Sequence, residues 1–224
     1  MHEGSPRAGL PSLQEEKPVP GAPTVYAYEG LVPVIDPTAW VHPAAVLIGD
    51  VIVGPGCYVG PGASLRGDFG RIVLERNSNV QDNCVVHSRP DFDCVMEEES
   101  HIGHGAVIHC ARIGRDAMVG INAVVMDRAT IGEQAIVAAM SFVKVGMQVA
   151  PRVLVAGIPG RVLRSLNDDD VHWKREGTRL YIELAQRCRA GLAPAAPLAA
   201  PEAGRGRVQW ALGVSRFEKS SRKT

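Results

Sequence analysis

An aliphatic side chain recurs every six residues through most of this 224-residue chain, and this period constrains the fold more than any other feature. Glycine often follows the aliphatic residue, as in "VIVGPG" and "CYVGPG". Amphipathic helices need a period near 3.6 and half-buried strands a period of about 2, so a period of six predicts a short strand and a tight turn, repeated. The chain is therefore predicted to be an all-β solenoid, a parallel β-helix with one buried apolar column. The repeat positions are Ile35, Val41, Leu47, Val53, Val59, Leu65, Val80, Val86, Ile102, Ile108, Ile113, Val119, Val125, Ile131, Val137 and Val143.

Two insertions, Asp68–Ser78 and Ser88–Ser100, interrupt the period. Insertions in a solenoid become loops on one side of the coils. The second insertion, "SRPDFDCVMEEES", is longer, polar and acidic, and it lies between His87 and His104 in the sequence. We therefore expect it to overhang whatever these histidines bind.

The flanks of the repeat differ from it in composition. The first residues are rich in Pro, Gly and Glu without a period, which is typical of disorder. After the repeat, Asn167 followed by three aspartates predicts a helix start, and Gly177 is expected to divide this region into two helices. The predicted segments are a disordered extension (1–23), a β-helix domain (24–158), C-terminal helices (159–190), and an Ala/Pro-rich linker with a basic tail (191–224).

The composition excludes several classes of partner. The formal net charge is zero, so no overall field attracts nucleic acid or an anionic membrane. No apolar run approaches the roughly 20 residues of a membrane helix, and the N-terminus lacks a signal-peptide pattern. The five cysteines are scattered without a CxxC pair, which is typical of reduced thiols. We expect a cytoplasmic protein that binds neither nucleic acid nor membrane.

Three histidines lie near the same level of the predicted coils. His87 and His109 directly follow repeat positions, and His104 stands two residues after Ile102. Three imidazoles with one open position are typical of catalytic zinc sites, whereas a single surface histidine commonly binds nothing. On a prism, residues five apart lie on neighbouring faces, so His104 and His109 do not easily chelate one ion within a chain. A metal shared between subunits is the hypothesis, and solvated histidines are the alternative.

The chain resembles the γ-carbonic anhydrase-like branch of the hexapeptide-repeat family in three motifs. "NVQDNCVVH" and "HIGHGAVIH" are similar to that family's zinc-binding segments, and "LRGDFG" to its Arg-x-Asp element. Over about residues 25–190 the pattern resembles the PaaY and CaiE subfamily. The resemblance implies a left-handed parallel β-helix with C-terminal α-helices. It also implies a homotrimer with metal sites between subunits and leaves the pairing of trimers open.

The resemblance assigns roles to individual side chains. It implies that His87 and His109 of one subunit and His104 of the next bind Zn²⁺, with Fe²⁺ or Co²⁺ as alternatives. It implies that Gln81 is catalytic and hydrogen-bonds water or substrate at the metal. Asn79 is expected to orient Gln81.

Other implied roles are structural, and one position departs from the family. Arg66 and Asp68 are expected to hold the subunit contact, and Asp82 to form an ion pair. Phe69 stands where efficient carbonic anhydrases have a glutamate that transfers protons. The glutamates Glu97–Glu99 are candidate substitutes, and solvated loop residues are the alternative.

Three functions are open at this point. The first is a zinc-dependent thioesterase of the PaaY type, which hydrolyses aromatic or ring-derived CoA thioesters in phenylacetate degradation. The missing proton shuttle favours this slower hydrolysis, because thiolate is a good leaving group. The second is a γ-class carbonic anhydrase that hydrates CO₂. The third is a hexapeptide-repeat acyltransferase with a histidine base and no metal, and a non-catalytic scaffold is a further alternative.

Overall fold

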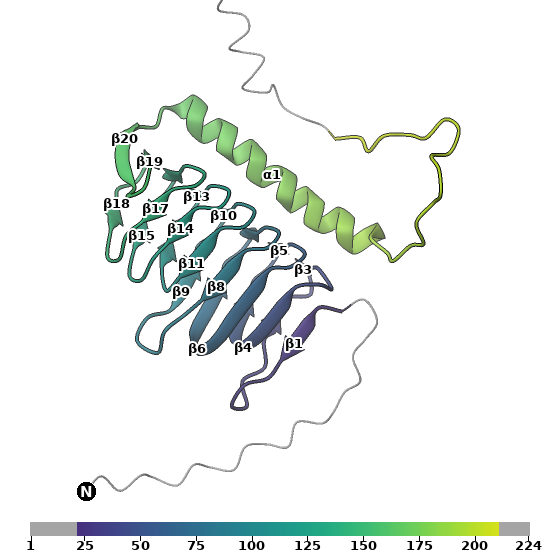
Figure 1. Ribbon diagram of the computed structural model, residues 1–224, viewed down its shortest axis with the longest axis horizontal. Helices are drawn as coiled ribbons and strands as arrows, with labels where there is room; N and C mark the ends of the chain where they lie inside the picture. The colour runs from purple at the N-terminus through teal and green to yellow at the C-terminus, as the bar shows by residue number, and fades with distance from the viewer. Residues whose placement is uncertain (1–21, 211–224) are drawn as a thin grey trace, which may run out of the picture.

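The computed structural model describes residues 22–210 and contains a parallel β-solenoid of about seven turns. This confirms the fold predicted from the six-residue period, while the left-handed sense remains an expectation of the resemblance. Figure 1 shows the stacked coils with a single long helix lying along one side. Strand partners on adjacent coils are typically eighteen residues apart, as in the pairs Val124–Phe142 and Thr130–Gln148. Three six-residue repeats therefore make one coil.

The coils form a prism with three faces, each a parallel ladder of short strands. We call the first the histidine face; it contains β1 (Thr24–Tyr26), β8 (Val85–His87), β11 (Val107–His109), β14 (Val124–Val125), β17 (Phe142–Val143) and the first halves of β4 (Val46–Val53) and β6 (Ser64–Leu74). The second face contains β2 (Val34–Ile35), β9 (Cys94–Met96), β12 (Arg112–Ile113), β15 (Thr130–Ile131), β18 (Gln148–Val149) and the second halves of β4 and β6. The third, the helix face, contains β3 (Trp40–Val41), β5 (Tyr58–Val59), β7 (Asn79–Val80), β10 (His101–Ile102), β13 (Met118–Val119), β16 (Ile136–Val137), β19 (Val153–Ala156) and the antiparallel β20 (Arg161–Ser165).

Each repeat position faces the interior of the prism. Leu47, Leu65, Ile102 and Ile108 are fully buried, and small residues such as Ala106 fill the corners between them. The sharp turns at the edges need a backbone with positive φ, which Gly105 supplies at +68° beside His104. A Cβ at Gly105 would lie 2.1 Å from Asn122 Oδ1 on the next coil, so no other residue fits there without displacement.

The second insertion is shorter than expected. The range predicted to be a polar loop, Ser88–Ser100, contains the buried strand β9, which pairs with β6 and β12. Only the turn around the Arg89–Phe92 bridge leaves the coil, at the edge between the histidine face and the second face. We call this edge the insertion edge. The expectation that the whole acidic segment overhangs the histidines was wrong.

One helix, α1 (Asp168–Gly191), covers the helix face where two helices were expected. Asn167 caps it as predicted, with a reciprocal capping box to Asp170. Gly177 does not break α1, because anchored residues flank it and the Gly penalty in a helix is only about 1 kcal/mol. Lys174 Nζ lies 2.6 Å from Asp116 Oδ1 and 2.7 Å from the Glu99 carbonyl oxygen, which fixes α1 to the prism.

Residues 161–165, expected to be helical, instead form β20, because the chain first returns antiparallel to β19. Within residues 22–210, no helix has the length and apolar character that crossing a membrane requires.

Candidate metal centre

Two of the three predicted ligands meet at the insertion edge. His87 ends β8 and His109 ends β11, and the two residues are direct partners in the parallel ladder. Their ring centroids are 5.3 Å apart, and His87 Nδ1 lies 3.2 Å from His109 Nε2. The one-coil spacing of the strands therefore brings these imidazoles together without any long-range packing.

Each of these rings also contacts a carboxylate through its other nitrogen. Asp68 Oδ1 lies 3.1 Å from His87 Nε2, and Asp127 Oδ2 lies 2.9 Å from His109 Nδ1. An ionised carboxylate only accepts hydrogen bonds, so each ring directs its N–H to the carboxylate. Two lone pairs then face each other across 3.2 Å. Either a proton on one of the two nitrogens or a metal ion between them relieves this repulsion.

The pair fits a tetrahedral metal. With metal–nitrogen bonds of about 2.0–2.1 Å, neighbouring nitrogens on a tetrahedral Zn²⁺ lie about 3.3 Å apart. The observed 3.2 Å matches this spacing. Carboxylate-bound imidazoles are the usual ligand arrangement in zinc proteins. Burial, together with the nearby charge of Arg66, lowers the pKa of His87 and so favours the neutral form that binds a metal.

The third predicted ligand lies at the opposite edge of the histidine face. His104 Nδ1 lies 3.0 Å from Asp82 Oδ2, and its Nε2 lies 3.3 Å from the hydroxyl of Tyr181 on α1. Burial raises the pKa of Tyr181 to about 12, so its hydroxyl keeps the proton and donates to Nε2. His104 thus has the same arrangement as the other two histidines, with one nitrogen on a carboxylate.

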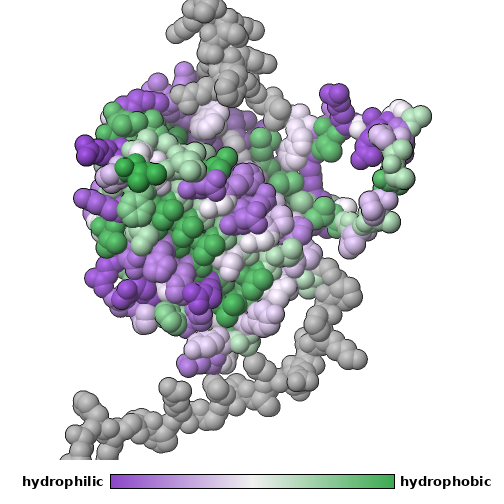
Figure 2. All heavy atoms as spheres, viewed as in Figure 1, coloured by the Kyte–Doolittle hydropathy of each residue, from purple (hydrophilic) through white to green (hydrophobic). Residues whose placement is uncertain are grey.

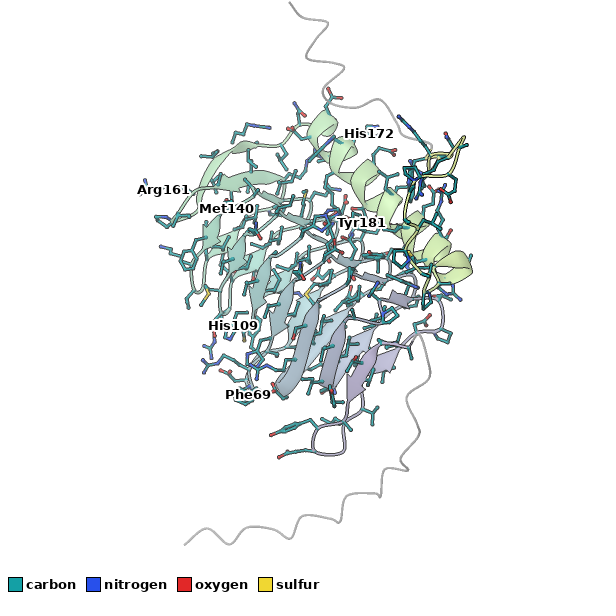
Figure 3. The ribbon with its side chains drawn as sticks, turned by 45° about the vertical axis from the view of Figure 1, so that its right-hand side comes forward. Phe69, His109, Met140, Arg161, His172 and Tyr181 are labelled. Carbon is teal, nitrogen blue, oxygen red and sulfur yellow. The ribbon has the colours of Figure 1, made fainter. Side chains whose placement is uncertain are left out.

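In one chain the three histidines do not converge. Between residues 22 and 210, no group of three His, Cys, Asp or Glu side chains is arranged to hold a metal ion. Figure 3 shows His109 and Phe69 at one margin of the prism and Tyr181, the neighbour of His104, beneath the helix. We call the His87–His109 pair and His104 with its neighbours the two candidate half-sites.

The other predicted residues divide between the half-sites. Asn79 on β7 and Gln81 directly after it are buried on the helix face, and the next residue, Asp82, contacts His104. Arg66 Nη1 lies 3.0 Å from Asp68 Oδ2 within the same chain, so Arg66 orients the carboxylate that holds His87.

The expected substitutes for the proton shuttle lie elsewhere. Glu97 and Glu98 occupy the edge between the second face and the helix face, where they pair with Arg112 and Arg76. Phe69 is more than half exposed, and its ring centroid lies 5.3 Å from that of His87. The His87–His109 half-site is thus bordered by an apolar ring.

Three residues of these half-sites were missed from the sequence. Asp127 stands eighteen residues, or one coil, after His109, and this spacing was a usable signal. His101 pairs with Asn79 in the ladder, which the repeat also predicts once the insertions are placed correctly. Tyr181 carried no signal, because the docking of α1 depends on the Lys174–Asp116 contact.

Comparison with known proteins identifies the family. Residues 110–144 match the bacterial transferase hexapeptide family, a model of six repeats. The chain is 54% identical over 186 residues to the carnitine operon protein CaiE of a Proteus strain, covering 83% of this chain and 94% of that protein. It is 53% identical over 190 residues to CaiE of Escherichia coli K12, covering 85% and 97%. The chain belongs to the CaiE family.

Solved structures with the same fold include hexapeptide transferases. A hexapeptide transferase family protein from Anaplasma phagocytophilum is 34% identical, with a TM-score of 0.71, covering 73% of this chain and 97% of that one. A Bacillus cereus protein described as a candidate acetyltransferase is 29% identical, with a TM-score of 0.74, covering 75% and 97%. Hexapeptide-repeat proteins typically form trimers. The CaiE-family chain is therefore a hexapeptide-repeat protein related to acyl-transferring enzymes.

Proposed function

We propose that this CaiE-family protein is a metal-dependent acyl-CoA thioesterase with its sites between the subunits of a homotrimer. The observation that supports it most is the arrangement of His87, His104 and His109. Each directs one ring nitrogen to a carboxylate, and the other nitrogen of His87 and of His109 is then available as a ligand. His104 Nε2 accepts from the Tyr181 hydroxyl in the single chain and would exchange this hydrogen bond for the metal. Two of these nitrogens already lie at the spacing of a tetrahedral site.

The surface between the two half-sites supports a trimer. Val85, on the histidine face, and Ile121 and Met140, at its His104 edge, are 45%, 47% and 61% exposed. Figure 2 shows hydrophobic side chains gathered across the prism surface, with hydrophilic ones around them. In a closed ring each subunit would join its insertion edge to the neighbour's His104 edge, which buries this apolar surface and completes three sites.

The proposed chemistry is hydrolysis of a thioester. The metal, Zn²⁺ with Fe²⁺ or Co²⁺ as alternatives, supplies a Lewis acid for the thioester carbonyl. Gln81 of the His104 half-site accepts a hydrogen bond from the attacking water and orients it. The carbon–sulfur bond breaks, and the products are a carboxylic acid and the CoA thiol. Phe69 offers an apolar contact for an aromatic or ring-derived acyl group.

Acyl transfer is the second candidate, and the likeness to transferase structures at 29% and 34% identity favours it. In this case His87, oriented by Asp68, acts as a base on an amine or hydroxyl acceptor, and no metal takes part. The acyl group still comes from a CoA thioester. The two candidates therefore differ in the acceptor, water or a second substrate, and in the need for a metal.

The test is CoA release from phenylacetyl-CoA, measured with a thiol reagent on zinc-loaded and chelator-treated protein. Carnitinyl-CoA is the second probe, because the curated relatives carry the carnitine-operon name. Chelator-sensitive release that is lost in His104→Ala and retained in His172→Ala supports the thioesterase. His172 is an exposed residue of α1 and serves as the matched control.

Other outcomes point elsewhere. Release that continues in His104→Ala would refute the metal role. CoA release that needs an added amine or alcohol and is unaffected by chelators supports acyl transfer. CO₂ hydration by a trimer that holds metal but releases no CoA supports the carbonic anhydrase alternative.

A further inference from the structure

A buried cluster of three polar side chains lies under α1, next to the His104 half-site. Asn79, Gln81 and His101 are 1%, 2% and 8% exposed. Gln81 Nε2 lies 2.7 Å from His101 Nε2 and 3.1 Å from Asn79 Oδ1. Asn79 Nδ2 lies 3.3 Å from His101 Nδ1. The three side chains thus form a closed ring of contacts.

The imidazole in this ring is neutral. Burial lowers the pKa of His101 to about 3, with the charge of Lys174 as a further cause. A neutral imidazole has one N–H and one lone pair. The two nitrogens of His101 therefore have opposite roles, and the position of the proton decides which amide can donate to the ring.

No arrangement around a neutral ring satisfies all three contacts. If His101 Nε2 is the acceptor, Gln81 donates to it and to Asn79, and only the contact between Asn79 Nδ2 and His101 Nδ1 is mismatched. Reversing one amide alone moves the mismatch to a contact of 3.1 Å or 2.7 Å. Two arrangements leave it at the longest contact, where it is least unfavourable: the observed one, with the proton of His101 on Nδ1, and one with both amides reversed and the proton on Nε2. The tautomer of His101 distinguishes the two.

We infer that His101 is a positioning residue that holds the Gln81 amide with its oxygen toward the reactants. Both hydrogens of the Gln81 amide are then used inside the cluster, on His101 and on Asn79. Gln81 can offer the site only an acceptor. This inference rests on the proposed function, in which an acceptor orients the attacking water. A reversed amide would offer a donor instead.

The position of the cluster supports this role. Asp82 directly follows Gln81 and bonds His104, so the chain that carries the amide also orients a proposed ligand. The ring of Tyr181 packs edge-on against His101, with centroids 5.3 Å apart, while its hydroxyl contacts His104. His101 itself touches no reacting atom in this arrangement and acts through Gln81.

The tautomer of His101 tests the inference without any activity. Long-range proton–nitrogen correlation spectra of ¹⁵N-histidine-labelled full-length protein distinguish the two tautomers. His42 is an internal reference, because its Nδ1 accepts from the Ala44 backbone N–H and its proton is therefore on Nε2. We expect His101 to be protonated at Nδ1, and its Nε2 resonance to move in Gln81→Met. A proton on Nε2, or an Nε2 resonance that Gln81→Met leaves in place, would overturn the inference.

Kinetics provide the second test. His101→Phe keeps the ring packing on Tyr181 but removes the acceptor, and we expect kcat to fall about 10- to 100-fold with KM within about twofold. His101→Gln places an oxygen near the position of Nε2 and is expected to restore most of the loss. Metal content and trimer size should match the wild-type protein in both. Full activity in His101→Phe, or no rescue by His101→Gln in a folded trimer, would refute the role.

The two tests separate the possible failures. If wild-type protein releases no CoA, the thioesterase proposal fails. The tautomer of His101 still decides whether His101 determines the orientation of the Gln81 amide. If release depends on metal but His101→Phe retains full kcat, the thioesterase proposal stands and only the positioning role fails.

Discussion

Replacing Asp127 should weaken metal binding, although this residue is not a ligand in the proposed site. Its carboxylate accepts the Nδ1–H of His109 at 2.9 Å, which holds the Nε2 lone pair toward His87. Burial raises the pKa of Asp127, but its hydrogen bond to His109 and further contacts bring it below the ordinary value. The side chain is therefore ionised at neutral pH, and it increases the basicity of the ring.

The size of the effect depends on what replaces the carboxylate. Asp127→Asn keeps an oxygen that accepts from Nδ1–H, so the tautomer survives and only the charge is lost. Loss of such a partner commonly lowers metal affinity 10- to 100-fold. We expect Asp127→Asn near the lower limit, about 10-fold or 1.4 kcal/mol, and Asp127→Ala near about 100-fold or 2.7 kcal/mol.

Competition with a chromophoric chelator for Zn²⁺ measures both affinities, and the visible spectrum of Co²⁺-loaded protein reports the ligand set. Asp91→Asn is the matched control, because Asp91 lies on the same edge and pairs with Arg89 and Arg128. We expect the control to bind as the wild-type protein does. If Asp127→Asn, Asp127→Ala and the control all bind the metal equally tightly, His109 does not bind the metal through Nε2, and the proposed arrangement is wrong.

Three further outcomes follow from the structure. Mixing inactive His87→Ala and His104→Ala subunits in equal amounts should restore about a quarter of the sites, measured as CoA release, because mixed trimers regain one complete interface; no recovery would contradict shared sites. Since the folded-state pKa of His101 is about 3 and the unfolded value 6.5, the unfolded chain binds its proton first as the pH falls. Stability should then decrease by about 1.4 kcal/mol per pH unit between these values, and urea titrations of His101→Gln should show a shallower slope. Asp116→Asn leaves the buried Lys174 without its anionic partner and should reduce the free energy of unfolding by about 3 kcal/mol in the same assay, whereas an unchanged midpoint would show that this pair does not anchor α1.

The six-residue period was sufficient to predict the fold, because the buried positions of each coil recur at a fixed spacing along the sequence. It did not predict which residues occupy the buried positions near the insertions. Leu74 stands six residues before Val80, and Met96 six before Ile102, and both are fully buried. Both lie within the ranges that the sequence analysis treated as insertions, and polar residues directly follow them. As a result, β9 was expected to be a loop.

The candidate site was predictable in its residues but not in its contacts. The histidine motifs located His87, His104 and His109, and the prism geometry correctly separated His104 from His109. The carboxylate on His109 and the amide cluster at His101 depend on which coils stack. The contact of Tyr181 depends on the docking of α1, which a polar pair directs. Hydrophobic periodicity does not report such a pair.

The places where the period fails mark the half-site better than the motifs do. Leu65 to Leu74 is nine residues, Val86 to Met96 ten, and Ile108 to Ile113 five. All three irregular steps cross the insertion edge, on successive coils, where the strands of the histidine face end. His87 and His109 end their strands at two of these steps, with Asp68 on the coil before and Asp127 on the coil after. The regular coils supply the buried core, and the irregular steps coincide with the edge where two of the three candidate ligands meet.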